Sequence, residues 1–248
     1  MTDPVFVRLD STASTNSYLA PLAPTAPHGM VVTTREQTAG RGQRGNSWES
    51  EPGRNLTFSI LLRPTSIAAR QQFVISEAVA IAISRVLQRY ITDRPVEVKW
   101  PNDIYVGDRK ICGTLIENSL IGAQIAYSIA GIGININQRQ FISNAPNPVS
   151  LIQLIDKEVD LDTILLQTTT EILSIVDTLS DEPMRHHVHK TFLSMLWHRH
   201  GIHPYRDTAT GATFQARIAD VAPDGMLHLV DTTGLHRFYA FKEVSQLL

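Results

Sequence analysis

Arg35-Glu36-Gln37-Thr38-Ala39-Gly40-Arg41-Gly42-Gln43-Arg44-Gly45-Asn46-Ser47-Trp48 is the stretch around which the chain is organised. It follows Met30-Val31-Val32-Thr33-Thr34, an apolar, β-branched run that predicts a strand. Glycine lets backbone N–H groups approach a ligand closely, and arginine presents a planar fork that pairs with carboxylate or phosphate. The stretch therefore indicates an anion site. A mobile surface loop has the same composition, and the phosphate-loop pattern GxxxxGK[ST] is absent.

The bulk composition limits the class of protein. With 248 residues, 43% of them hydrophobic, the chain is long enough for one large domain and a small appended one. A net charge of -2 gives no broad basic face for DNA. The single cysteine, Cys112, excludes an intrachain disulfide and favours a cytoplasmic location. Neither a signal sequence nor an apolar run of about 18 residues is visible, so a membrane protein is not expected.

Hydrophobic periodicity predicts the main elements. Strands are expected at 5–9, 30–34, 55–62, 95–100, 104–106, 110–117 and 124–137, and helices at 16–22, 71–91, 161–179 and 184 to about 200. From residue 201 onward, short strands at 212–221, 226–230 and 237–241 alternate with Asp-Gly and Thr-Thr-Gly turns, which indicates a small β-barrel.

A polar cluster, Ser14-Thr15-Asn16, lies between the first strand and the first helix. Such side chains commonly cap helices, and they also suit the polar ring of a ligand. The segment alone leaves both readings open. Ser11-Thr12 is a second Ser-Thr pair; the pair at 14–15 is chosen because Asn16 follows it at the helix start.

A second group of chemically informative residues surrounds one turn: Lys99, Asn102, Asp103, Lys110 and Gly113. Taken singly, Lys99 is expected to be a solvated strand lysine and Asp103 either an Asx turn or a functional carboxylate. Lys110 lies three residues before Gly113, where the missing side chain would let a ligand lie flat. A functional role for Lys110 depends on its belonging to the same site as the arginine stretch.

Two glycines interrupt the strand predicted at 124–137. Gly131 and Gly133 indicate either a β-bulge or a floor on which a ligand approaches the backbone, and Asn135 offers an amide that can read a purine edge. Cys112 is interpreted as a small apolar strand residue. The region 186–203 is rich in histidine but lacks a recognised metal-ligand spacing, so these side chains are interpreted as solvated or capping (His186, His187, His189, His198, His200 and His203).

These pieces, in this order, resemble the biotin protein ligase family. The matching residues are Ser14-Thr15-Asn16, Gln37-Thr38-Ala39-Gly40-Arg41-Gly42-x-Arg44-Gly45-x-x-Trp48, Lys99-Trp100-Pro101-Asn102-Asp103, Lys110-x-x-Gly113 and Gly131-x-Gly133-x-Asn135. The resemblance implies an α+β fold like that of class II aminoacyl-tRNA synthetases and biotin ligases, in which helices flank a mixed sheet. It also implies a catalytic domain over 1–200 and a small SH3-like β-barrel over 201–248.

The resemblance further implies an ATP-dependent biotin–[biotin carboxyl carrier protein] ligase. Biotin and ATP, with Mg²⁺, would give biotinyl-5′-AMP, and a lysine of a biotin carboxyl carrier domain of acetyl-CoA carboxylase or a related carboxylase would take the biotinyl group. The implied catalytic residues are Arg41, Lys110 and Asp103, of which Asp103 would orient either the incoming lysine amine or a metal. The implied biotin-binding residues are Ser14, Thr15, Asn16, Gln37, Gly40, Arg41, Gly42, Gln43, Lys110, Gly113 and Gly131. Those implied for ATP or the adenylate are Arg44, Trp48, Asn102, Gly133 and Asn135, and no metal ligand is defined.

Two positions depart from the family pattern. Gln43 stands where many members have arginine, and Asn46 stands where a basic residue is common, so retention of the adenylate is expected to be weaker. The chain starts directly with the catalytic domain, so the helix-turn-helix of some relatives is expected to be absent. The sequence allows a homodimer.

The alternatives are a lipoate protein ligase and a non-enzymatic module that binds biotin or an adenylate. The first would show an arginine-led run of three glycines near a histidine. The second would not need Lys110 together with both arginines of the loop.

Overall fold

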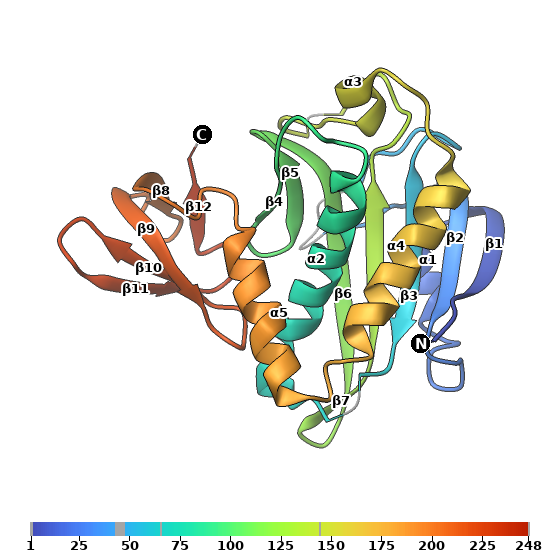
Figure 1. Cartoon of the computed structure of the whole chain (residues 1–248), viewed down its shortest axis with the longest axis horizontal. Helices are drawn as coiled ribbons and strands as arrows, with labels where there is room; N and C mark the ends of the chain where they lie inside the picture. Colours follow the sequence, from blue (N-terminus) through green and yellow to red (C-terminus); the bar gives the residue numbers. More distant parts are fainter. Residues whose placement is uncertain (1, 43–47, 65, 144, 248) are drawn as a thin grey trace.

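A computed structural model of the chain describes residues 2–42, 48–64, 66–143 and 145–247 (Figure 1). Within these ranges, seven strands form one sheet in the order β1-β2-β3-β7-β6-β5-β4. Their bounds are β1 (Val5–Thr12), β2 (Met30–Gln37), β3 (Leu56–Leu62), β4 (Val96–Lys99), β5 (Asp103–Val106), β6 (Arg109–Ile121) and β7 (Gln124–Ile134). The helices are α1 (Thr15–Leu19), α2 (Phe73–Gln88), α3 (Leu151–Ile155), α4 (Leu161–Val176) and α5 (Glu182–Ser194), with a short 3₁₀ helix, η2 (Ala69–Gln71).

The sheet is mixed. β1 and β2 run parallel, whereas the other neighbours pair antiparallel. Because α1 lies between β1 and β2 in the chain, the polar cluster at 14–16 falls where the chain leaves the end of β1. The fold class expected from the sequence, a mixed sheet flanked by helices, is confirmed.

The two faces of the central strands carry different partners, because successive side chains of a strand point to opposite faces. Val31, Ile60 and Ala130 belong to the main core, in which α2, α4 and α5 contribute buried residues. Their neighbours Val32, Leu61 and Ile129 pack instead with Leu19 of α1. The long helices thus cover one face (Figure 1), and α1 lies on the other.

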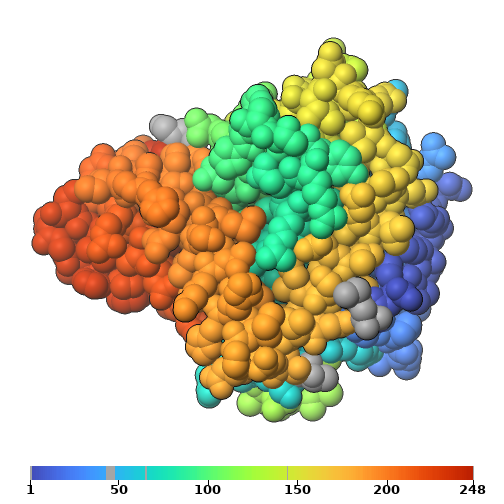
Figure 2. Space-filling model, viewed as in Figure 1, coloured from blue at the N-terminus to red at the C-terminus, as the bar shows by residue number. Residues whose placement is uncertain are grey.

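A second sheet follows α5. It consists of β8 (His203–Asp207), β9 (Thr213–Val221), β10 (Leu227–Asp231), β11 (His236–Tyr239) and β12 (Val244–Gln246), antiparallel in the order β11-β10-β9-β8-β12. These residues project as a lobe beside the helices (Figure 2). The turn between β9 and β10 reaches back to the first sheet, where Trp100 Nε1 donates to the carbonyl of Gly225 at 3.0 Å.

Two expectations about the elements are corrected, and three elements were not expected. The helix expected to reach about residue 200 ends at Ser194, because Met195 and Trp197 instead form backbone hydrogen bonds with Val98 of β4. The β-bulge considered at Gly131 and Gly133 is absent, since both residues keep an unbroken register with β3 and β6. The sequence analysis also missed β8, β12 and α3. No described helix is long and apolar enough to cross a membrane.

Candidate active site

One cavity of about 600 Å³ lies over the middle of the seven-stranded sheet. This volume is within the range of small-molecule sites. Gly131 and Gly133 line it, and they alternate along β7 with Ala130 and Ile132 of the main core, so the cavity opens on the face that carries α1. The candidate residues that line it are Ser14, Thr15, Asn16, Gln37, Arg41, Gly42, Trp48, Asn102, Asp103, Lys110, Gly113, Gly131, Gly133 and Asn135.

Three candidates need separate mention. Gln43 and Arg44 lie outside the described residues, as does Asn46, so the inference about adenylate retention stays a prediction. Gly40 does not line the cavity. Its backbone supports that of Trp48, because the backbone N–H of Trp48 donates to the Gly40 carbonyl at 3.1 Å. A Cβ at Gly40 would lie 2.9 Å from the Trp48 backbone carbonyl oxygen.

One end of the cavity is a buried polar cluster where α1 meets β2 and β3. The Oε1 atom of Gln37 accepts from the backbone N–H of Thr15 at 2.8 Å and lies 3.2 Å from its hydroxyl. The hydroxyl of Ser59, which the sequence analysis missed, lies 2.7 Å from Thr15 Oγ1 and 2.5 Å from Asn16 Oδ1. The N-cap residue Ser14 makes no side-chain cap hydrogen bond, so capping does not account for its hydroxyl. Ser11 and Thr12 belong to β1 and do not line the cavity.

The Asn16 amide braces this end of the cavity. Its Nδ2 donates to the Leu115 carbonyl at 3.3 Å and to Glu117 Oε2 at 2.7 Å. With Oδ1 beside Ser59, both ends of the amide are engaged. Asn16 therefore shapes the cavity wall, whereas Thr15 and Gln37 present the polar groups beside it.

Glycines form the floor. Gly113 of β6 pairs with Gly133 of β7, which leaves a strip without side chains across two neighbouring strands. The indole of Trp48 lies on it: a Cβ at Gly133 would approach the ring to 2.4 Å, and one at Gly113 to 3.0 Å. A Cβ at Gly131 would lie 2.3 Å from Asn16 Oδ1. The functional reading of these glycines, close approach rather than a bulge, agrees with this geometry.

Two cationic side chains, Lys110 and Arg41, lie beside the glycine floor, and each has a carboxylate nearby. Lys110 Nζ lies 2.7 Å from Asp103 Oδ2, and both side chains are 30% exposed. Arg41 is more exposed, at 51%; its Nη2 donates to the Ser17 hydroxyl at 3.2 Å and lies 3.7 Å from Glu117 Oε1. Paired cations of this kind can exchange a protein carboxylate for an anionic ligand without leaving a charge unpaired.

The two asparagines expected to serve a nucleotide differ. Asn102 braces the floor, because its Nδ2 donates to the Thr114 carbonyl while its own carbonyl accepts from the Thr114 hydroxyl. Asn135 lies just past the end of β7, and its Nδ2 donates to the Val149 carbonyl at 3.1 Å. Its buried Oδ1 has no partner in the described part of the chain. An unpaired buried acceptor is costly, so Asn135 presents an oxygen suited to an amino donor on a ligand.

A wall that the sequence analysis missed completes the cavity. Phe141, Ser143, Ala145, Pro146 and Pro148 line it, together with Glu49 and Phe241. No spacing or motif marks the first five in the sequence, because they come from an irregular connection between β7 and α3. Only its position directly after Asn135 could have suggested a contribution to the site.

The environment of Lys99 differs from the expected solvated position. Its ammonium lies 4.8 Å from the ring centroid of Tyr105 and 4.7 Å from that of Trp197. Burial lowers the pKa of Lys99, partly offset by the charge of Asp103, which faces it across the β4–β5 hairpin. Lys99 does not line the cavity.

The histidine-rich region shows no metal site: among the described residues, no group of three histidine, cysteine or carboxylate side chains could hold an ion. His189 is nevertheless neither solvated nor a cap. Its Nδ1 lies 2.7 Å from the buried carboxylate of Glu77 on α2, and its Nε2 lies 3.1 Å from Asp220 on β9. A hydrogen bond to Glu77 raises the pKa of His189, and burial raises the pKa of Glu77.

The comparisons with known proteins agree with this geometry. A model of the biotin/lipoate A/B protein ligase family matches residues 7–135, slightly more than half of the chain. The chain belongs to this family. The matched region contains every candidate site residue, from Ser14 to Asn135, and the family expected from the sequence is therefore confirmed.

Individual relatives cover the chain to different extents. It is 27% identical over 223 residues to the bifunctional ligase/repressor BirA of Bacillus subtilis, covering 87% of this chain and 66% of that protein. It is 35% identical over 134 residues to BirA of Escherichia coli, covering 54% of this chain and 41% of that protein. The chain thus spans between two fifths and two thirds of the length of these relatives.

A solved structure supports the fold over the whole chain. The biotin protein ligase from Aquifex aeolicus, in complex with biotin and ATP, matches with a TM-score of 0.79 at 22% identity, and the match covers 98% of each chain. Both sheets are therefore included in the likeness.

Proposed function

We propose that this chain is a biotin protein ligase. It would activate biotin with ATP to biotinyl-5′-AMP, release pyrophosphate, and transfer the biotinyl group to a lysine of a biotin carboxyl carrier domain. The observation that carries the proposal is the order of groups along β7. Gly131 lies at the Thr15–Gln37 end, Gly133 lies under Trp48, and Asn135 presents the unpaired oxygen. At about 3.3 Å per strand residue, these positions span roughly 13 Å, a length suited to an extended acyl-adenylate.

Different residues of the cavity serve different parts of the ligands in the first reaction. Thr15 and Gln37 suit the polar ureido ring of biotin, and Asn135 suits the exocyclic amine of adenine. Between them the carboxylate of biotin must approach a phosphate, and the like charges repel. Arg41 and Lys110 supply the positive charge that stabilises this approach and the charge that develops on the phosphorus oxygens.

For the transfer step, we assign Asp103 to orient the acceptor amine and take its proton. A free lysine has a pKa of roughly 10.4, so the attacking amine is protonated at neutral pH. Two carboxylates are found in the described cavity lining, Asp103 and Glu49. Glu49 already accepts three hydrogen bonds, whereas Asp103, among the described residues, is held by Lys110 alone and would be released when Lys110 turns to phosphate.

Magnesium is expected to accompany ATP. Mg²⁺ prefers one or two carboxylates besides phosphate oxygens. Of the two carboxylates in the described lining, Glu49 is engaged by protein donors and Asp103 is assigned to the acceptor amine, so we assign the ion no ligand among the described residues. We also propose that 1–200 form the catalytic domain, that 201–248 form a separate small domain, and that the protein acts in the cytoplasm, where a free, buried Cys112 stays reduced.

The test is direct labelling. The purified protein, ATP, magnesium and biotin are mixed with the biotin carboxyl carrier domain of an acetyl-CoA carboxylase, and the product is measured by intact mass. The proposal expects the mass of one biotinyl group on the carrier and pyrophosphate that depends on biotin. No label with biotin, but label with lipoate on a lipoyl domain, would identify the other activity of the family. Adenylate formed without transfer would reject the carrier assignment.

A further inference from the structure

Glu49, which directly follows Trp48, makes contacts that the proposed chemistry does not use. Its Oε1 accepts from the backbone N–H of Ile142 at 2.9 Å and from Gln138 Nε2 at 3.1 Å, and its Oε2 accepts from the backbone N–H of Ser143 at 2.9 Å. One side chain thus joins the end of the arginine-glycine stretch to the 138–143 segment. Phe141 and Ser143 of this segment line the cavity.

Within the 138–143 segment, Gln138 is buried and the Arg139 carbonyl accepts from Gln153 Nε2 at 2.8 Å, whereas residues 141–143 are largely exposed. Ile142 is 91% exposed, so its side chain contributes no apolar burial. Ser143 is also exposed, and Phe141 is only partly buried. The backbone N–H groups of Ile142 and Ser143 both donate to the Glu49 carboxylate. The carboxylate is therefore the principal attachment of this part of the cavity wall.

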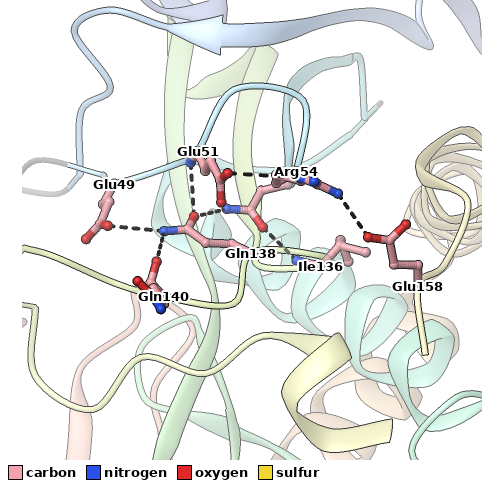
Figure 3. Close-up of polar contacts among 8 residues, drawn as sticks. Glu49, Glu51, Arg54, Ile136, Gln138, Gln140 and Glu158 are labelled. Carbon is pink, nitrogen blue, oxygen red and sulfur yellow. Dashed lines mark hydrogen bonds and ion pairs between the residues drawn. The ribbon is translucent and has the colours of Figure 1, made fainter. Parts of the chain in front are cut away.

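Gln138 anchors the Glu49 side chain (Figure 3). It is buried, and its amide is fully used: Oε1 accepts from the Glu51 N–H at 3.0 Å and from Asn55 Nδ2 at 2.5 Å, while Nε2 donates to Glu49 and to the Gln140 carbonyl. Asn55 in turn accepts from the N–H of Ile136 at 2.9 Å. The network is thus rooted on the paired ends of β3 and β7.

The charge of Glu49 is compensated locally. Burial would raise its pKa, but hydrogen bonds from Ser143, Ile142 and Gln138 outweigh burial and lower it. These donors come from both backbone and side chain, and among the described residues they stabilise the ionised carboxylate without an arginine or lysine. An ionised Glu49 whose oxygens face N–H groups opposes a bound triphosphate less than an unpaired carboxylate would.

From this arrangement we propose that Glu49 is a positioning residue for the nucleotide half of the cavity, an inference that rests on the proposed ligase function. By fixing the 138–143 segment against the backbone beside Trp48, it sets the distance between the wall at Phe141 and the Trp48 indole. The adenosine of ATP binds between these surfaces, whereas the biotin half at Thr15 and Gln37 is formed by other elements. Loss of the carboxylate then affects the nucleotide and leaves biotin unaffected.

The experiment compares Glu49→Ala with a matched control, Glu51→Ala. The Glu51 side chain is about half exposed and, among the described residues, reaches Arg54 alone, at 4.0 Å. The Glu51 backbone N–H that donates to Gln138 survives the substitution. Biotin-dependent pyrophosphate release gives KM for ATP and for biotin separately. Hydrogen exchange of the peptide that contains Ile142 and Ser143 reports the attachment itself.

For Glu49→Ala we expect KM for ATP to rise about tenfold, equivalent to about 1.4 kcal/mol, with KM for biotin changed less than about twofold. Exchange at Ile142 and Ser143 should accelerate, and Glu51→Ala should match the wild type in all three measurements. Glu49→Gln keeps one acceptor oxygen and should lie between them. Equal rises in both KM values, unchanged exchange, or an equal effect of Glu51→Ala would overturn the proposal. A wild-type protein that releases no pyrophosphate would instead reject the ligase function, whatever the exchange shows.

Discussion

The substitution Gly131→Ala tests whether the biotin half of the cavity is set by backbone approach. The added methyl group would lie 2.3 Å from Asn16 Oδ1 and 2.9 Å from its Cγ, closer than nonbonded atoms allow. Residue 131 carries an unbroken ladder to β3 and β6, so the backbone cannot retreat easily. The Asn16 side chain must therefore move, and it is held by Ser59, Leu115 and Glu117.

The cost can be worked from these contacts. A neutral hydrogen bond contributes about 0.5–1.5 kcal/mol and one to a charged group about 1.5–3 kcal/mol. Overpacking of a dense site typically costs about 1–3 kcal/mol. If Asn16 shifts enough to lose Ser59 and to weaken its bond to Glu117, we expect the free energy of unfolding to fall by about 2 kcal/mol. Because Thr15 is adjacent and shares Ser59, biotin affinity should fall at least about tenfold.

Gly133→Ala is the matched comparison, one side-chain repeat further along the same face of β7. Its methyl group would meet the Trp48 indole, whose Nε1 has no partner in the described part of the chain. The ring can move without losing a hydrogen bond, so we expect a stability loss below about 1 kcal/mol, unchanged biotin affinity and a raised KM for ATP. Urea unfolding and calorimetric titration with biotin measure both variants. Wild-type biotin affinity in Gly131→Ala, or equal loss in both variants, would refute the reasoning.

Four further predictions concern single groups. Lys110→Ala should lower adenylate formation at least about a hundredfold with little change in unfolding, and Asp103→Asn should retain adenylate formation but slow transfer to the carrier; pyrophosphate release and carrier labelling separate the two steps. The folded-state pKa of His189 is raised by Glu77, so its contribution is complete below the unfolded pKa of about 6.5 and is lost as pH rises through the folded value. Wild-type stability should therefore fall by about 1–2 kcal/mol more than that of His189→Gln between pH 6 and pH 9, measured by urea unfolding. Cys112 is fully buried and its pKa is raised by burial, so a thiol reagent should label it only after unfolding.

The sequence predicted the elements whose patterns arise from burial. The stripe of α2 and the alternation in β3 are imposed by the core they contact, and both elements were found close to their expected bounds. The end of α5 was missed for the opposite reason. Residues 195–197 continue the helical pattern in sequence. Met195 and Trp197 nevertheless form backbone hydrogen bonds with Val98, some hundred residues earlier, as a neighbouring strand would. A contact of that sequence separation leaves no local signal.

The site residues show the same difference between what a local pattern predicts and what contacts distant in sequence decide. Residues recognised by motif were gathered around one cavity, because a motif specifies ligand-facing positions directly. The exact use of each side chain was less predictable: the Asn16 amide is committed to Ser59, Leu115 and Glu117, although the sequence placed it among ligand-binding groups. Glu49 was missed because its importance depends on backbone N–H groups some ninety residues away, and no side-chain pattern records those.

The pairing of charges explains how two cationic side chains are accommodated in one partly buried cavity. Lys110 is paired with Asp103, and Arg41 lies near Glu117. An unpaired cation at a partly buried site would lose hydration without compensation, whereas a paired cation keeps a compensating charge. Under the proposed function, a nucleotide phosphate would replace Asp103 as the partner of Lys110, and the freed Asp103 carboxylate would then be available to the acceptor amine in the transfer step. The binding required for the first reaction would thereby prepare a group used in the second.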